Sequence, residues 1–335
     1  MRLTALAPGK TNLCLFLGGT RADGLHELVS VIEPLSLADE LTLEPLPGAA
    51  LVAAAPGAGD MGCAAGEDEV VCAGVEGPNL AGAALAAFRA ASGWEGPPLR
   101  LTIAKRVPVA AGMGGGSGDA AAALRLVAHA AGRRADDPLL ARLAPQLGAD
   151  VPSQVAPGPL LVGGAGEELR PLPSLPPHGV LVLPSPHALS TRDVFREADR
   201  LGLGRSADEL AERRATLEAV LAAAGASAAS AGAAARAASP LPPELLVNDL
   251  EPAARSLCPS IDAALSAARA AGADHALVSG SGPTVVGVFA GPDGPAAAAA
   301  AAQQLRARFP GAVGAHPVDA AFAAVRGVWN HEPPA

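Results

Sequence analysis

Hydrophobic and polar residues alternate near the start of the chain in the way expected of strands that bury one face. In residues 41–45, for example, Thr42 and Glu44 separate apolar neighbours. The Pro8-Gly9 pair is typical of a turn. Four strands are therefore predicted, over residues 2–7, 12–17, 28–36 and 40–46, with the first two joined by that turn.

Helical spacing and helix-ending residues dominate the segment that follows. Asn79 precedes a helical run that Gly93 can end, and Pro138 can open a helix that ends at Gly148. The predicted elements are helices over 79–92, 119–131 and 138–148 and a strand over 99–107.

The second half of the chain alternates strands and helices irregularly. Strands are predicted over 180–183, 276–279, 284–289 and 312–318, and helices over 190–202, 206–224, 249–258, 260–271 and 296–308. The Ala-rich tract 222–239 can extend a helix or form a loose insertion. Because no regular βαβ repeat is present, an α+β fold is favoured over a doubly wound sheet. Prolines over 171–177 indicate a linker, so we predict two domains, residues 1–160 and 161–335, with the boundary near 155–175.

Composition limits the core and the partners. Half of the 335 residues are hydrophobic but only 2% are aromatic and Tyr is absent, so Ala, Leu and Val must build the core. The formal net charge is −9 and no long basic run occurs, which disfavours a nucleic-acid partner, since such a partner requires Lys and Arg to neutralise its phosphates. An acidic protein can still bind a phosphorylated ligand through backbone amides or a helix N-terminus.

Neither a membrane span nor a signal peptide is recognisable. Lys10 and Asn12 interrupt the first apolar run, and no later run has the required length. The spacing of the cysteines fits neither a zinc site nor a disulfide framework; they stand at positions 14, 63, 72 and 258. We therefore expect a cytoplasmic, reduced protein, a monomer or homodimer, with no membrane partner and no metal site of its own.

The most informative segment is a glycine-rich loop between Pro108 and Asp119. Glycine occupies positions 112, 114, 115, 116 and 118. Without Cβ atoms the backbone can curl around an anion and aim several N–H groups inward, and the following helix adds its positive end. Ser117 offers a hydroxyl to a phosphate oxygen or a metal. A flexible surface loop is the alternative, but an ordinary turn needs only one or two glycines, and five lose much entropy on ordering.

Two better-known phosphate loops do not fit this chain. Gly9-Lys10-Thr11 ends like a Walker A loop, but Thr4 stands where its first glycine is required. The segment from Gly116 partly matches the dinucleotide fingerprint, but the loop is longer and richer in glycine than that motif needs.

Lys10 and Asp150 are the candidate catalytic pair. The chain has only two lysines, Lys10 and Lys105, and otherwise uses Arg, which suggests sites that need a compact ammonium. Chance survival on the surface is the alternative for each. Asp150 can cap a turn, or it can accept the proton of an alcohol during phosphoryl transfer. An ammonium beside Asp150 would keep it ionised and stabilise developing alkoxide charge.

Three segments together resemble the GHMP kinases, the superfamily of galactokinase, homoserine kinase, mevalonate kinase and phosphomevalonate kinase. They are Ala7 to Leu13, the loop over 108–121 and Val278 to Thr284. Within that superfamily the chain is similar to the kinases of 4-diphosphocytidyl-2-C-methyl-D-erythritol. The segments that carry this closer likeness are Arg21 to Leu28, Gly112 to Ser117, Leu147 to Pro152 and Asn248 to Glu251.

The resemblance implies a two-domain GHMP kinase fold in which ATP and an alcohol meet in the interdomain cleft. It implies that Lys10 and Asp150 are catalytic and that ATP, carrying Mg²⁺, phosphorylates the 2-hydroxyl of 4-diphosphocytidyl-2-C-methyl-D-erythritol in non-mevalonate isoprenoid synthesis. The ATP-binding residues it implies are Asn79, Lys105, Pro108, Ala110, Gly112, Met113, Gly114, Gly115, Gly116, Ser117 and Gly118.

The resemblance also implies the residues that bind the alcohol. Asn12 would hold the methylerythritol end, while His26 would meet the cytosine, because an imidazole can both donate and accept. The remaining residues implied are Leu25 and Phe195 at the cytosine and Gly280, Ser281 and Gly282 behind the phosphates.

The chain departs from the family pattern at two positions. Leu25 stands where the family usually has Tyr, and a lost aromatic stack costs about 1–3 kcal/mol per base. Gly118 stands where a second Ser is usual, which removes a hydroxyl near the phosphates. Two alternatives stay open, namely another GHMP kinase such as homoserine kinase, and a GHMP-fold protein that binds a nucleotide without chemistry. The presence of both Lys10 and Asp150 disfavours the second.

Overall fold

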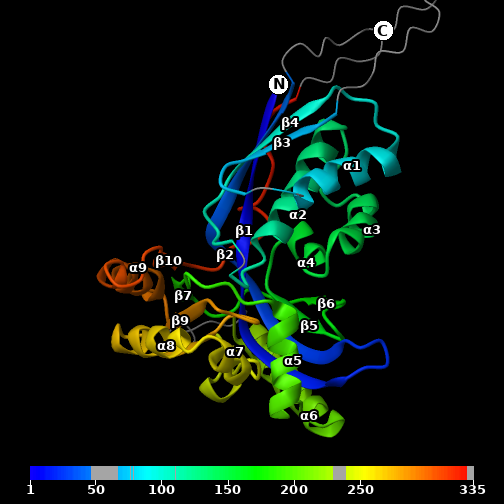
Figure 1. The fold of residues 1–335 in the computed structure, drawn as a ribbon. Helices are drawn as coiled ribbons and strands as arrows, with labels where there is room; N and C mark the ends of the chain where they lie inside the picture. The colour runs from blue at the N-terminus through cyan, green and yellow to red at the C-terminus, as the bar shows by residue number, and fades with distance from the viewer. Residues whose placement is uncertain (47–66, 76, 78, 110, 229–238, 330–335) are drawn as a thin grey trace, which may run out of the picture.

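Two β-sheets and the helices packed on them make up the fold (Figure 1). The computed structural model describes residues 1–46, 67–75, 77, 79–109, 111–228 and 239–329. Its mixture of helices and largely antiparallel strands agrees with the α+β class that the sequence predicts. Both ends of the described chain lie at the same end of the molecule, because the last strand returns to pair with the first.

The first sheet has seven strands in the order β11-β1-β2-β4-β3, with β5 beside β2 and β6 beside β5. All neighbours are antiparallel except β3 and β4. A long hairpin of β1 and β2 runs through the molecule (Figure 1). The strands are β1 (Arg2–Thr20), β2 (His26–Pro45), β3 (Glu69–Cys72), β4 (Leu99–Ala104), β5 (Leu160–Gly163), β6 (Glu168–Pro171) and β11 (Arg326–Val328).

The hairpin corrects the predicted strand boundaries. The turn expected at Pro8-Gly9 is wrong, because β1 continues through it and only shifts register against β2 between Pro8 and Lys10. Such a bulge lets a strand pass a proline, which has no amide to donate, without ending. The predicted break between residues 36 and 40 is absent as well, since Ala38 pairs with Pro8.

Four helices cover one face of the first sheet (Figure 1). They are α1 (Leu80–Ser92), α2 (Gly115–Ala130), α3 (Pro138–Leu147) and α4 (Val151–Val155). Asn79 caps α1 and Gly93 ends it in the left-handed region, as the sequence predicts. Helix α2 begins four residues earlier than the predicted start at residue 119, so that the second half of the glycine loop is helical.

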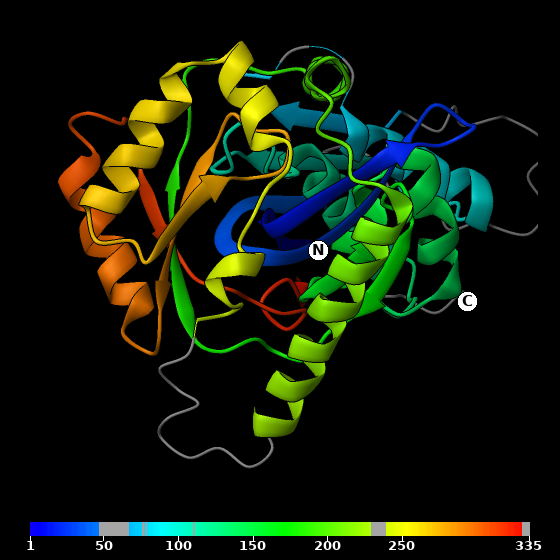
Figure 2. The ribbon, with the colours of Figure 1, turned by 90° about the horizontal axis from the view of Figure 1, so that it is seen from below.

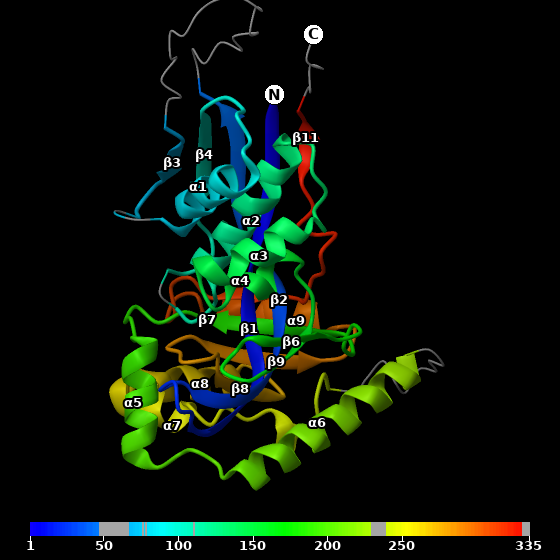
Figure 3. The ribbon, with the colours of Figure 1, turned by 90° about the vertical axis from the view of Figure 1, so that its right-hand side faces the viewer.

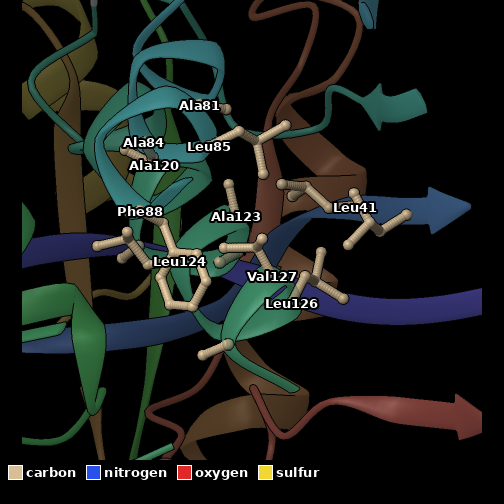
Figure 4. Close-up of a cluster of buried hydrophobic side chains, with 14 of the residues drawn as sticks. Leu41, Ala81, Ala84, Leu85, Phe88, Ala120, Ala123, Leu124, Leu126 and Val127 are labelled. Carbon is tan, nitrogen blue, oxygen red and sulfur yellow. The ribbon is translucent and has the colours of Figure 1, made fainter. Parts of the chain in front are cut away.

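Helix α2 is the centre of this half and is buried on nearly all sides after its first turn. Phe88 of α1 and Leu124 of α2 pack together with Leu41 of β2 (Figure 4). Alanines such as Ala120 and Ala123 bring the helices close, and this agrees with a core built from small and aliphatic residues.

The second sheet has four antiparallel strands in the order β10-β7-β9-β8. They are β7 (His178–Leu183), β8 (His275–Val278), β9 (Val285–Ala290) and β10 (Val313–Ala315). Helices α8 (Ser260–Ala270) and α9 (Gly294–Leu305) cover one face of it (Figure 2). The other face packs against the far half of the β1–β2 hairpin, where Phe16 and Val31 meet Val180 and Val286.

Three further helices complete the second half. They are α5 (Thr191–Leu201), α6 (Ala207–Ala228) and α7 (Glu251–Leu257), and a 3₁₀ turn spans Pro243–Leu245. Helix α6 reaches into the Ala-rich tract and projects along the lower edge of the molecule (Figure 3). The rest of that tract, 229–238, lies outside the described residues. The domain boundary at 160/161 stays a prediction. Strand β5 begins at this position, and β5, β6 and β11 all belong to the first sheet although most of their residues follow residue 160.

In the described part of the chain, no helix has both the length and the apolar character needed to cross a bilayer.

A buried ion pair joins the two sheets. Glu33 of β2 places Oε2 3.0 Å from Nε2 of His178, the first residue of β7, and both side chains are almost completely buried. The other ring nitrogen of His178 donates to the Pro176 carbonyl at 2.8 Å. Burial opposes a charged imidazole, but the negative charge of the Glu33 carboxylate at 3.0 Å outweighs it, and the pKa of His178 is raised.

This pair predicts a pH-dependent stability. Its contribution should be complete below about pH 6.5, the ordinary pKa of an unfolded histidine, and should be lost as the pH rises through the raised pKa of His178. Glu33→Gln should therefore flatten the fall of the unfolding free energy as the pH rises above about 6.5, measured by urea unfolding. His129→Gln, at an exposed position, serves as the control. An unaltered pH dependence in Glu33→Gln would contradict the assignment.

Candidate functional site

The glycine loop ends in the N-terminus of a long buried helix. Gly112 and Gly114 have φ of +74° and +67°, a region that glycine enters without penalty. The first bond of α2 runs from the Gly118 amide to the Gly114 carbonyl, at 2.8 Å. The amides of Gly115, Gly116 and Ser117 therefore stand outside the helical ladder and, with the helix dipole, form a ready site for an anion.

Gly112 and Gly114 also need to be glycine because other segments of the chain approach their Cα atoms closely. A Cβ on Gly112 would lie 2.8 Å from the Gly282 carbonyl oxygen, and one on Gly114 would lie 3.1 Å from Cγ of Lys10. The loop thus wedges between β1 and the turn that joins β8 to β9. Segments that are far apart in the sequence meet at these two glycines.

We predict that Gly112→Ala will destabilise the fold and weaken nucleotide binding. A non-glycine residue at this φ costs about 1–3 kcal/mol, and the new methyl group must also displace the Gly282 backbone. Urea unfolding and ATP titration measure the two effects. Gly93→Ala is the matched control, because Gly93 also has a positive φ but a Cβ there meets no atom within 4 Å. Equal ATP affinities in the two variants would contradict the prediction.

Lys10 and Asp150, predicted as a pair, lie close together. Lys10 Nζ is 4.0 Å from Asp150 Oδ2; the lysine side chain is 11% exposed and the carboxylate 55%. The Lys10 amide donates to the Met113 carbonyl at 2.8 Å, which fixes β1 to the loop. The bulge between Pro8 and Lys10 is therefore the point where the strand meets the phosphate loop.

Asn12 orients the ammonium group. Lys10 Nζ donates to Asn12 Oδ1 at 2.9 Å, and Asn12 Nδ2 donates to Ser30 Oγ at 2.8 Å. Ser30 in turn donates to the Cys14 carbonyl at 2.6 Å. The sequence analysis misses Ser30, because a serine within an apolar strand carries no signal of its partner on the neighbouring strand.

Arg125 holds the helix that begins after Asp150, and it too is missed by the sequence analysis. This buried guanidinium of α2 donates to the Gln154 carbonyl at 2.6 Å and the Leu6 carbonyl at 3.0 Å, so it ties the end of α4 to β1. Burial lowers its pKa to about 10. An arginine in an Ala-rich helix ordinarily indicates an exposed position, and the sequence offers no contrary signal.

Two cavities meet at the glycine loop. The first, of about 310 Å³, is lined by the loop together with residues such as Asn79, Lys105 and Pro108. The second, of about 360 Å³, is lined on one side by Lys10 and Asp150. The residues common to both are Gly112, Gly114 and Ser117. A ligand in the first cavity can therefore extend past these three residues and present a terminal group to Lys10 and Asp150.

Lys105 reaches the first cavity but is already paired. Its ammonium donates to Asp39 at 2.5 Å and to Asp119 at 2.8 Å. Asp39 also accepts from the amides of Arg106 and Val107, whereas Asp119 Oδ1 is buried with no hydrogen-bond partner among the described residues. Burial, opposed by Lys105, raises the pKa of Asp119 to about 7. The cluster anchors α2 near the end of β4. Because two carboxylates already neutralise the Lys105 ammonium, it contributes little positive charge to the first cavity.

The other residues predicted for ATP fall into three groups. Asn79 and Met113 line the first cavity, although the Asn79 side chain also accepts from the Ala81 amide to cap α1. Gly118 faces β1, where a Cβ would lie 3.2 Å from the Pro8 carbonyl oxygen, so the hydroxyl of a serine there would have to fit against β1. Ala110 lies outside the described residues.

The second-sheet glycine turn closes the second cavity. Gly280 and Ser281 line it, and Ser281 Oγ lies 3.0 Å from Thr191 Oγ1, at the start of α5. Asn248 holds the turn by donating to the carbonyls of Val278 and Gly280, both at 2.7 Å. Gly282 contacts the phosphate loop instead of lining the cavity.

A third cavity, of about 500 Å³, continues from the second. Leu28, Thr191 and Phe195 line both of them. His26 and Phe195 stand at its wall with ring centroids 5.1 Å apart and a tilt of 45°. Leu25 lines it as well and is 55% exposed. The predicted cytosine residues therefore lie together.

Two protein-family models match this chain, one in each half. The family described as GHMP kinases N terminal domain matches residues 79–158, and GHMP kinases C terminal matches residues 195–311. The first match contains the glycine loop and Asp150, and the second contains Phe195 and the turn at Gly280.

Similar proteins cover almost the whole chain. A protein of Anaeromyxobacter dehalogenans named 4-diphosphocytidyl-2-C-methyl-D-erythritol kinase is 38% identical over 92% of this chain and 87% of its own length. A protein of Rhodopseudomonas palustris with the same name is 38% identical over 93% and 95%.

Solved structures of kinases also resemble this fold. The crystal structure of a 4-(cytidine 5'-diphospho)-2C-methyl-D-erythritol kinase has a TM-score of 0.68 at 32% identity, covering 93% of this chain and 98% of that one. A homoserine kinase from Cytophaga hutchinsonii has a TM-score of 0.65 at 14% identity, covering 97% of each, which shows a shared fold alone. The chain belongs to the GHMP kinases, in the family of the 4-diphosphocytidyl-2-C-methyl-D-erythritol kinases.

Proposed function

We propose that this protein transfers the γ-phosphoryl group of ATP to the 2-hydroxyl of 4-diphosphocytidyl-2-C-methyl-D-erythritol, a step of non-mevalonate isoprenoid synthesis. One observation carries the proposal: the first and second cavities share the phosphate loop, and Lys10 and Asp150 stand just beyond it. A nucleotide and an alcohol bound in separate cavities would thus meet at one pair of charged groups. The names of the similar proteins supply the substrate.

The residues suggest how the transfer proceeds. ATP would occupy the first cavity with its terminal phosphates against the amides of Gly115, Gly116 and Ser117. The substrate hydroxyl would lie beside Asp150, which takes its proton as the new O–P bond forms and the bond to the β-phosphate oxygen breaks, with release of ADP. Lys10, oriented by Asn12, would stabilise the charge that develops on the transferring group.

We propose that Mg²⁺ arrives with the nucleotide. Among the described residues no group of three or more His, Cys, Asp or Glu side chains could hold a metal ion. Mg²⁺ often keeps several waters and binds through one or two carboxylates and substrate phosphates, so a site of this kind needs few protein groups. Ser117, which lines both the first and the second cavity, is suitably placed to contact it, and bound Mg²⁺ would neutralise phosphate charge.

The third cavity would take the cytosine, with Phe195 against one face of the base. Leu25 offers no ring for the other face, so we predict that Leu25→Tyr will lower the substrate KM by on the order of tenfold through stacking. Steady-state kinetics should show little change in kcat, since the base is remote from the transferring phosphate. Leu257→Tyr is the control, at another exposed leucine. A raised KM in Leu25→Tyr would show that this side of the cavity does not face the base.

A panel of alcohols in a coupled assay for ADP tests the proposed function. The cytidylyl substrate should be phosphorylated, and homoserine and mevalonate should not. Turnover of homoserine without turnover of the cytidylyl substrate would overturn the proposal in favour of another GHMP kinase. ATP binding without turnover of any alcohol would favour a nucleotide-binding role. The cytoplasmic location stays a prediction of the sequence.

A further inference from the structure

The imidazole of His26 is held by the carboxylate of Asp199, a residue of α5 that lines the same cavity. His26 Nε2 lies 2.7 Å from Asp199 Oδ1 and 3.3 Å from Thr20 Oγ1. The His26 side chain is 9% exposed, whereas that of Asp199 is 53% exposed. An ionised carboxylate can only accept a hydrogen bond, so the proton of a neutral His26 must be on Nε2.

The second ring nitrogen is then an acceptor. No hydrogen bond of Nδ1 to another described residue is present, and the ring stands at the wall of the third cavity beside Phe195. Asp199 follows Phe195 by four positions on α5, so both side chains project from the same face of one helix. One helix therefore supplies an aromatic face for a base and also fixes the hydrogen-bonding character of the neighbouring imidazole.

We propose that Asp199 is a positioning residue that determines base specificity, an inference that rests on the proposed function. By keeping the proton on Nε2, Asp199 presents the bare Nδ1 lone pair of His26 to the base. The exocyclic amino group of cytosine can donate to this lone pair. Uracil carries a keto oxygen at the same position, and that oxygen has only lone pairs to offer. A site built to accept a hydrogen bond rejects a ligand that lacks the donor.

A purely structural role for Asp199 makes a different prediction. The same contact ties α5 to the tip of the β1–β2 hairpin, and loss of a tie would loosen the cavity for every pyrimidine alike. The ratio of affinities for two nucleotides separates the roles, because loosening changes both affinities, whereas a changed tautomer changes their ratio.

The test is calorimetric titration of the full chain with CDP and with UDP, without ATP. The wild type should bind CDP at least about tenfold more tightly, and Asp199→Ala should reduce that preference by on the order of tenfold. Asp208→Ala is the control, because Asp208 is an exposed aspartate near the start of α6 that lines none of the three cavities. Equal binding of CDP and UDP by the wild type, failure to bind CDP, or an unchanged preference in Asp199→Ala would each overturn the inference.

A second measurement reads the tautomer directly. Nitrogen-15 NMR of histidine-labelled protein, with His26 assigned by its loss in His26→Gln, should show a protonated Nε2 and a bare Nδ1 at neutral pH. In Asp199→Ala this tautomer should lose its dominance. A wild-type His26 that carries a proton on Nδ1, with or without one on Nε2, would contradict the proposal. If the protein binds CDP selectively but phosphorylates no cytidylyl substrate, the proposed function fails while the role of Asp199 stands. If the wild type phosphorylates the cytidylyl substrate but Asp199→Ala keeps the wild-type preference for CDP, the proposed function stands and the role of Asp199 fails.

Discussion

Asp150→Asn should lower kcat by on the order of 10²–10⁴-fold, the usual contribution of a positioned general base. The amide cannot accept the hydroxyl proton, and it removes the negative charge that faces Lys10 at 4.0 Å. Affinity for ATP should change little, because Asp150 lines the second cavity and not the first. Stopped assays for ADP, with titration of an ATP analogue, measure the two quantities.

The control for Asp150→Asn is the same replacement of an aspartate outside the candidate site. Asp136→Asn replaces a carboxylate that is 70% exposed and pairs only with Arg134 among the described residues. Its kcat should equal that of the wild type. Because the Asp150 side chain is half exposed, its replacement should leave the unfolding midpoint nearly unchanged. Turnover near the wild-type level in Asp150→Asn would show that another group takes the proton.

Lys10→Met should lower kcat by about 10²–10³-fold, the effect of removing one charged donor that faces the transition state. Methionine fills the space of the lysine stem, which packs beside Gly114, but leaves Asn12 Oδ1 without its donor. Lys10→Arg keeps the charge, yet its planar guanidinium cannot reproduce a compact ammonium in this narrow position, so only partial activity should return.

Rapid-quench measurement of a single turnover is the appropriate assay for Lys10, since it separates the chemical step from product release. Arg170→Met serves as a control because it removes one cation from the surface, where Arg170 is 56% exposed. A normal single-turnover rate in Lys10→Met, with only ATP binding weakened, would show that Lys10 binds the nucleotide and does not stabilise the transferring phosphate.

Local signals predicted those parts of the fold that local chemistry determines. Asn79 and Gly93 bound α1, and Pro138 begins α3, because caps and prolines act on the residues beside them. The same reasoning failed at Pro8-Gly9, where a pair typical of turns lies inside a strand. The strand persists because β2 pairs with it on both sides of the bulge, and that partner is not visible in a short window of sequence.

Four short strands were missed for the same reason, although β8 and β10, which are equally short, were predicted. Strands β3, β5, β6 and β11 have three or four residues each and exist through pairing with distant strands. A run of that length carries too little periodicity to distinguish it from a loop. The register of β11 against β1 joins the two ends of the chain, which no local pattern can indicate.

The candidate site shows the same division. The glycine loop and Lys10 are recognisable because a dense glycine run and one of only two lysines stand out in this composition. Asp150 is recognisable through the resemblance of its segment, Leu147 to Pro152, to the family. The supporting residues are not: Lys105 was expected near the nucleotide, but its partner Asp39 lies 66 residues away in the chain. Arg125 likewise bonds to carbonyls of distant segments, and only the folded backbone brings those acceptors together.

The most direct test of the central claim is identification of the product. Purified protein, ATP and 4-diphosphocytidyl-2-C-methyl-D-erythritol should yield ADP and one new phosphomonoester, which phosphorus-31 and proton NMR should place on the 2-oxygen of the methylerythritol. Release of ADP without that ester, or phosphate attached at another hydroxyl, would contradict the arrangement of the two cavities around Lys10 and Asp150.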